Sequence, residues 1–123
     1  MYLKSAGGQL GLHTAEHPVP PGYLVPPHIH ADDDEAFYIV TGDLTLLSDQ
    51  GETVAGPGST VLLPRGKMHG FRNDTDRDAR VLVVCQPGSQ ALEMFRHFDR
   101  AREAATGGLT PTDIAAISAR YGV

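Results

Sequence analysis

Short apolar segments recur at even spacing along the first 87 residues, with turn-forming residues between them. Residues 9–17 alternate weakly between apolar and polar positions and are predicted to form an edge strand. Segments rich in leucine, β-branched or aromatic residues predict further strands: EAFYIV (35–40), LTLLS (44–48), STVLLP (59–64) and RVLVVCQ (80–86). The sequences TGD, DQGE, GPG and DTDRDA between them are typical of turns. This pattern predicts an all-β sandwich or barrel.

The periodicity changes near residue 90, where apolar residues begin to recur three or four positions apart. This spacing predicts a C-terminal helical segment over about 90–121. The pair Gly107 and Gly108 predicts the end of a first helix. The TPTD sequence that follows resembles a capping box, with Thr110 as N-cap and Asp113 three residues later, and predicts the start of a second helix.

Length and composition limit the protein class. A chain of 123 residues suits one domain, with the barrel over about 9–87. The net charge of −5 argues against a nucleic-acid partner, which selects basic surfaces. No apolar run approaches the ~20 residues of a membrane span, and the N-terminus lacks the apolar core of a secretory signal. We therefore expect a cytoplasmic protein with no membrane partner.

The stretch PPHIHADDDE carries the first candidate chemistry. His28 and His30 are two residues apart, so in a strand both imidazoles point to the same face. Glu35 follows after a short loop that could bring its carboxylate to the same place. Imidazoles with a carboxylate suit iron, nickel, copper, zinc or manganese. The alternative from these residues alone is a surface histidine pair beside a solvated acidic loop.

Two longer patterns favour the metal site. The first is G-x5-H-x-H-x4-E-x6-G, at Gly22, His28, His30, Glu35 and Gly42. The second is G-x5-P-x-G-x2-H-x3-N, at Gly58, Pro64, Gly66, His69 and Asn73. These patterns match the two signature motifs of the cupin superfamily at every fixed position, so the chain resembles a single-domain cupin.

The resemblance implies a double-stranded β-helix, or jelly-roll barrel, of two antiparallel sheets with short C-terminal helices. It also implies one divalent transition metal (Fe, Ni, Mn, Cu or Zn) bound by His28, His30, Glu35 and His69. General similarity is greatest to the quercetin-dioxygenase-like group of bacterial cupins. Quercetinases proper are often two-cupin chains, whereas this chain has one cupin, so a flavonol substrate does not follow.

The residues around the metal motif suggest a small-molecule site. Four protein ligands leave about two positions open on a six-coordinate metal. Resemblance to quercetinases suggests a second, catalytic role for Glu35 as a proton acceptor, the alternative being a ligand only. Strand alternation gives five substrate-pocket candidates, Leu24, Pro26, Phe37, Ile39 and Phe71. The alternative is that these side chains only fill a small barrel.

Other polar residues are assigned structural or surface positions. Asp32, Asp33 and Asp34 are predicted to form a solvated loop, because acidic side chains are rarely buried unpaired. Cys85, the sole cysteine, ends an apolar strand and is predicted to be a small buried residue. The remaining histidines, His13, His17 and His97, are predicted to lie on the surface, the alternative for His13 and His17 being a position at the rim of the barrel mouth.

Three functions are compatible with these residues. The first is a metal-dependent oxygenase, quercetin 2,3-dioxygenase-like, acting on a small phenolic, enolic or diketone compound. The second is a metal-dependent isomerase, cyclase or lyase on the same scaffold, and the third is a non-catalytic module that binds a metal or small ligand. One fold hosts many functions, so fold alone does not decide. A homodimer is expected, because exposed edge strands need covering.

Overall fold

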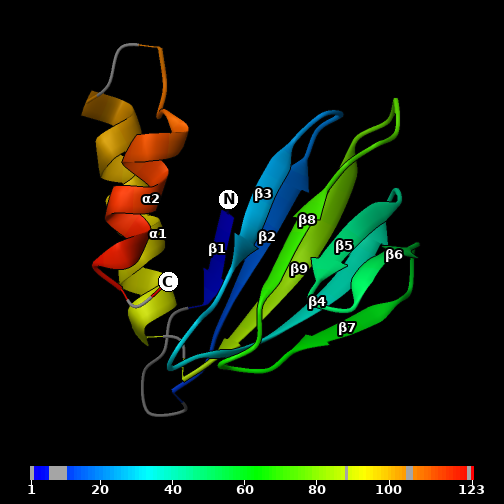
Figure 1. Ribbon diagram of the computed structural model, residues 1–123, viewed down its shortest axis with the longest axis horizontal. Helices are drawn as coiled ribbons and strands as arrows, with labels where there is room; N and C mark the ends of the chain where they lie inside the picture. Colours follow the sequence, from blue (N-terminus) through cyan, green and yellow to red (C-terminus); the bar gives the residue numbers. More distant parts are fainter. Residues whose placement is uncertain (1, 6–10, 88, 105–106, 122) are drawn as a thin grey trace.

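Two antiparallel sheets and two helices make up the computed structural model, which describes residues 2–5, 11–87, 89–104, 107–121 and 123 (Figure 1). The strands are β1 (Tyr2–Ser5), β2 (His13–Val19), β3 (Leu24–His28), β4 (Asp34–Thr41), β5 (Leu44–Ser48), β6 (Gly51–Ala55), β7 (Thr60–Leu63), β8 (His69–Arg72) and β9 (Ala79–Gln86). The helices are α1 (Ser89–Ala104) and α2 (Pro111–Ala119).

The strands divide into a five-stranded sheet in the order β1-β2-β9-β4-β7 and a four-stranded sheet in the order β3-β8-β5-β6. Every described pairing is antiparallel. Strands distant in sequence therefore lie together, as β2 and β4 do on either side of β9. This arrangement confirms the predicted all-β fold with short C-terminal helices.

The core lies between the two sheets and follows from strand alternation. In β9 the buried residues are Ala79, Val81, Val83 and Cys85, whereas the residues between them are more exposed. The inward rows of neighbouring strands meet the row of β9, as the pairing of Val83 with Phe37 shows. Across the core, Phe37 of β4 meets Phe71 of β8 edge to face, with ring centroids 5.4 Å apart. Aromatic and branched side chains thus hold the two sheets together.

The predicted edge strand over 9–17 is corrected by the structure. Residues 9 and 10 lie outside the described residues, and β2 begins at His13. It is an interior strand, since it pairs with β1 on one side and with β9 on the other. Weak alternation suggested an edge, because the pairing with residues 2–5 is a tertiary contact that local pattern does not encode.

Two motif residues that are not metal-ligand candidates, Gly42 and Asn73, have structural roles in turns. A Cβ on Gly42 would lie 2.7 Å from the Ala79 backbone, so only glycine allows β4 to turn into β5 against the end of β9. The buried Asn73 amide donates to the carbonyls of Val19 and Arg77, and its oxygen accepts from Thr75. These two residues close the barrel at the end where β2, β8 and β9 meet.

The helices pack against each other and lie to one side of the sheets in Figure 1. The predicted capping box is confirmed, because Asp113 N donates to Thr110 Oγ1 and Thr110 N donates to the Asp113 carboxylate. The surface prediction for His97 is corrected, since its ring is part-buried and its Nδ1 lies 3.0 Å from the Tyr121 hydroxyl.

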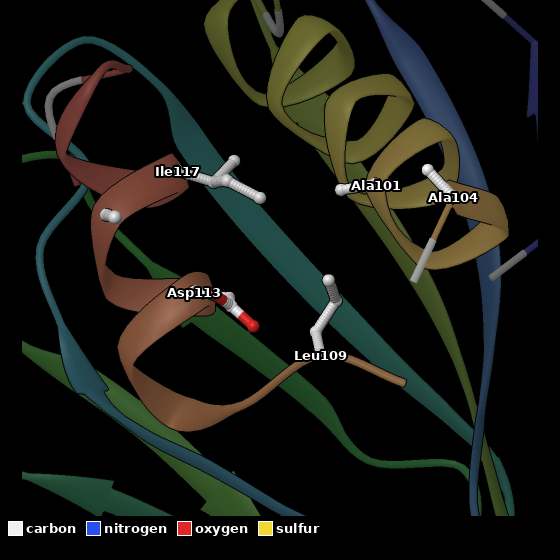
Figure 2. Close-up of a pocket in the computed structure, with 6 residues that line it drawn as sticks. Ala101, Ala104, Leu109, Asp113 and Ile117 are labelled. Atoms are coloured by element: carbon white, nitrogen blue, oxygen red, sulfur yellow. The ribbon is translucent and has the colours of Figure 1, made fainter. Parts of the chain in front are cut away.

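A groove of about 380 Å³ separates the helices (Figure 2), and Ile117 of α2 faces Ala101 of α1 across it. Its lining is mainly apolar: Ala101, Ala104, Leu109, Asp113, Ala116 and Ile117. In the described part of the chain, no helix has the length and apolar character needed to cross a membrane.

Candidate metal centre

Three histidines from two distant parts of the chain, His28 and His30 in one and His69 in the other, come together between the sheets. His28 ends β3, His69 begins β8, and the two residues are paired in the sheet. His30 lies in the loop after β3 and is 4% exposed, as is His69. One ring nitrogen from each histidine lies within 4.8 Å of the others. This cluster has the residue types and spacing to hold one metal ion.

The tautomer of His28 is fixed by its own strand, β3. Nδ1 of His28 lies 2.8 Å from the Pro26 carbonyl oxygen, to which it donates when protonated. Nε2 then carries the lone pair, as a metal ligand must. That Nε2 lies 3.2 Å from Nε2 of His30. A cation between the rings would be bound by both nitrogens.

Glu35 of β4 supplies a buried carboxylate beside two of the histidines. Its Oε1 lies 3.5 Å from His30 Nε2 and its Oε2 lies 3.3 Å from His69 Nε2. The Cys85 thiol donates to Oε1 at 3.4 Å. Burial by itself would raise the pKa of Glu35, but the neighbouring His69 and His30 and the Cys85 thiol hold this pKa below its ordinary value. Glu35 is therefore ionised at neutral pH.

Two of the histidines, His28 and His30, are neutral at the same pH. Burial lowers the pKa of His28 to about 4, against the opposing effect of its bond to Pro26. Burial also lowers the pKa of His30, although the Glu35 charge opposes it. Neutral imidazole is the form that binds metals, because the lone pair is free. Within the described residues, Nδ1 of His30 and Nδ1 of His69 have no hydrogen-bond partner, and Nε2 of His69 faces the Glu35 carboxylate, so the donor set fits a cation.

Backbone geometry places these side chains. The β3–β8 register shifts between Val25 and His28, and β3 passes very close to Gly70. A Cβ on Gly70 would lie 2.7 Å from the Val25 oxygen. On the other side, Gly66 N donates to the His30 carbonyl at 2.8 Å. The loop before β8 is therefore tied to the loop that carries His30.

The pocket candidates divide into two groups. Phe37, Ile39 and Phe71 are at most 5% exposed and belong to the core between the sheets. The prediction that Leu24 and Pro26 face inward with His28 is wrong, because both are exposed. The register shift in β3 interrupts the alternation, so that Val25, rather than Leu24, packs against the core.

Three surface predictions near the site are also corrected. His13 is 0% exposed, because β2 is an interior strand and His13 is on its inward face. His17, on the same face, is part-buried against Tyr23 and Phe71, with ring centroids 5.3 and 5.7 Å away. Asp33 is 1% exposed, whereas Asp32 and Asp34 are exposed as predicted.

Sequence reasoning missed the burial of His13 and the bond of Cys85 to Glu35. The spacing of His13, Ala15, His17 and Val19 carried the signal, since all four share one strand face. Cys85 is buried as predicted, but its bond to Glu35 depends on the β4–β9 register. Such a register is a long-range pairing that a single strand sequence does not contain.

Two facing antiparallel sheets around a histidine cluster define a small β-barrel protein with a candidate metal centre. The Cupin_2 family, described as a cupin domain, matches residues 16–85, which span both motifs. The chain therefore belongs to the cupin domain family, as the motifs suggested.

Individual relatives differ in the reactions that their names give. Germin-like protein 5-1 of Oryza sativa subsp. japonica is 29% identical over 109 residues, covering 82% of this chain and 49% of that protein. The chain thus spans about half the length of this curated relative. A cupin-superfamily sugar phosphate isomerase of Silicibacter pomeroyi is 33% identical, with a TM-score of 0.58, covering 61% of this chain and 50% of that one. The polyketide cyclase RemF of Streptomyces resistomycificus is 33% identical with the same TM-score, covering 62% of this chain and 54% of that one.

Proposed function

We propose that this cupin binds one divalent transition metal through His28, His30 and His69 together with Glu35. We further propose that the protein uses this centre as an oxygenase, similar to quercetin 2,3-dioxygenase, that acts on a small phenolic, enolic or diketone compound. The observation that carries the proposal is the convergence of three imidazoles and one buried carboxylate between the sheets. When bound, the metal supplies Lewis acidity toward substrate oxygens, and a redox-active metal supplies dioxygen chemistry as well.

The chain's own residues have separate roles in this proposal. The histidines hold the centre, and Pro26 fixes the ring orientation of His28. Glu35 is ionised and buried, so it can accept a proton from a substrate O–H or C–H group. Phe37 and Phe71 are buried two residues after Glu35 and His69 on the same strand faces, so they give the interior beside these ligands an apolar character. A phenol, enol or β-diketone presents the acidic proton and the oxygens that this arrangement suits.

A redox-neutral reaction is the second candidate. The two structures of 33% identity are named as a sugar phosphate isomerase and a polyketide cyclase. Neither name describes an oxygenase. In general, isomerisation or cyclisation of a carbonyl compound needs a group that accepts a proton next to the carbonyl. A proton acceptor at Glu35 would serve this chemistry equally, so the two candidates differ in their need for dioxygen.

Dioxygen uptake separates the candidates. The protein would be loaded with Fe, Ni, Mn, Cu or Zn and given quercetin or 2,4-pentanedione, in air and under nitrogen. The oxygenase predicts uptake with at least one redox-active metal, and replacement of Glu35 by Gln should lower kcat about 100-fold. Glu93→Gln is the matched control, because Glu93 is an exposed residue of α1.

Each other outcome has a defined meaning. Turnover that persists under nitrogen would favour the isomerase or cyclase reading. Metal binding without turnover of any compound would favour a non-catalytic binding module. If the wild-type protein bound none of the five metals, the proposal of a metal centre would be rejected.

A further inference from the structure

His13 is a buried imidazole for which the proposed chemistry has no role. Its side chain is 0% exposed, and neither ring nitrogen has a hydrogen-bond partner within the described residues. Nearly all buried polar groups are hydrogen-bonded, and an unsatisfied one destabilises the folded state. An apolar residue of similar size would avoid this cost, so the imidazole calls for a functional explanation.

The strand register places His13 on the same wall as Glu35. His13 pairs with Cys85, and Cys85 pairs with Glu35, so the three residues form one inward-facing row across β2, β9 and β4. Adjacent strands are about 4.8 Å apart, which separates the backbones of His13 and Glu35 by roughly 10 Å. The thiol of Cys85 donates its proton to Glu35 and offers none to His13. Neither ring nitrogen of His13 is therefore engaged by its neighbours in this row.

The chemical character of His13 suits an oxygen-bearing group. Burial lowers its pKa, against the opposing charges of Asp33 and Glu35, so the ring is neutral. A neutral imidazole offers one N–H donor and one acceptor nitrogen. It can donate to a carboxylate or carbonyl oxygen and can exchange hydrogen bonds with a hydroxyl group.

We propose that His13 is a substrate-binding residue that holds a second oxygen-bearing group of a ligand whose first oxygens meet the histidine cluster. The ligand class is then a small diketone or enol with an additional carboxylate or hydroxyl group. This inference rests on the proposed metal centre and specifies the substrate that it takes.

A pair of diketones that differ at one end tests the proposal. 2,4-Pentanedione has the two metal-binding oxygens only, and 2,4-dioxopentanoate adds a carboxylate. Their affinities for the Zn²⁺-loaded protein would be measured by calorimetry for wild type, His13→Leu and His13→Gln. The leucine variant should bind 2,4-dioxopentanoate about 10- to 100-fold more weakly, the range for a hydrogen bond to a charged group. Its affinities for 2,4-pentanedione and for Zn²⁺ should change less than twofold.

Two further readouts separate this role from a structural one. The glutamine variant retains a donor and should recover part of the lost affinity. In wild type, the ¹⁵N resonances of the His13 ring should shift with 2,4-dioxopentanoate and stay in place with 2,4-pentanedione, a test that does not depend on the variants folding. Because Leu removes an unsatisfied buried group, the melting temperature should not fall.

The contrary outcomes are equally specific. Equal losses for both diketones, or no loss for either, would overturn the role of His13 while leaving the metal centre intact. A large loss of Zn²⁺ affinity in the leucine variant would make His13 part of the metal site instead. Failure of the wild-type protein to bind Zn²⁺ would reject the metal centre, and this inference with it.

Discussion

At the scale of single residues, Cys85 connects a structural position to the chemistry of the site. Burial and the nearby Glu35 raise the pKa of its thiol, so the sulfur keeps its proton and serves as a donor. A donor on Oε1 turns the carboxylate toward its two histidines. In the proposed function this makes Cys85 a positioning residue for Glu35.

Replacement of Cys85 tests this connection. Cys85→Ala removes the donor and should weaken Ni²⁺ binding about tenfold, which is typical for groups that orient metal ligands. Cys85→Ser retains a hydroxyl donor and should remain within about threefold of wild type. Titration calorimetry at pH 7.5 would measure both affinities. Equal losses in the two variants would show that sulfur packing, and not the hydrogen bond, matters here.

The depressed pKa of His28 gives a pH dependence with a definite sign. In the unfolded chain this imidazole takes up a proton near pH 6.5, whereas in the folded protein it resists protonation down to about pH 4. The unfolded state therefore binds more protons between these values, and stability falls as the pH falls from 6.5 toward 4. The pKa values of His13, His17 and His30 are lowered in the same direction.

Denaturation of the metal-free protein would show this effect. We expect the free energy of unfolding to drop by about 1–3 kcal/mol between pH 7 and pH 5, a range in which Glu35 stays ionised. His28→Asn keeps a polar group at this position but does not titrate, so its curve should be flatter. Stability that is constant or rises toward pH 5 would contradict the neutral state of the histidines.

The residue scale also shows what the sequence can predict about a site. Fixed offsets identified the three clustered histidines, because those offsets match a family in which the barrel brings such positions together. Strand alternation placed Phe37, Ile39 and Phe71 correctly in the interior. It failed for Leu24 and Pro26, since a register shift in β3 follows from pairing with β8 and leaves no mark in local alternation.

At the scale of elements, the predicted strands agree with the observed ones where one face of the strand is buried. LTLLS coincides with β5, and EAFYIV extends by one residue at each end to become β4. The capping box fixed the start of α2, because its hydrogen bonds are local. The strand order was beyond this reasoning, since β9 lies between β2 and β4 through contacts that span much of the chain.

The close pairing of β3 with β8 positions two of the metal-ligand candidates, His28 and His69. Gly70→Ala would put a methyl group 2.7 Å from the Val25 oxygen and 2.8 Å from the Pro27 nitrogen, and backbone atoms have little freedom to move away. We expect a loss of roughly 2–3 kcal/mol in unfolding free energy and weaker Ni²⁺ binding, because His69 and His28 are held by these strands. Urea denaturation and titration calorimetry would measure the two effects.

Gly56→Ala is the matched control for Gly70→Ala. Its Cβ would meet a single side-chain oxygen of Asp43 at 3.1 Å, which a small rotation relieves, and its backbone has no positive φ. The control should therefore stay close to wild type in both measurements. A Gly70→Ala protein as stable as the control would show that the strands separate easily and that the site tolerates their movement.

At the scale of the whole molecule, one exposed apolar surface offers a contact for a second copy. Tyr38, Val40 and Leu62 are 45%, 42% and 73% exposed on the outer faces of β4 and β7. Among the described residues, β7 is also an edge of its sheet. An unpaired edge beside apolar side chains favours association, so we propose that a homodimer forms here.

Light scattering at working concentration would measure the mass of the wild-type protein and of Leu62→Lys. We expect a dimer for wild type and a monomer for the variant, because a lysine on each copy places two like charges in a contact that excludes water. Leu24→Lys is the matched control, as Leu24 is an exposed leucine of β3, in the other sheet. A wild-type monomer would reject the dimer, and dissociation by the control alone would move the interface to β3.

Because His28 and Glu35 lie between the sheets rather than on the outer face of β4, the monomeric variant should bind Ni²⁺ as tightly as wild type.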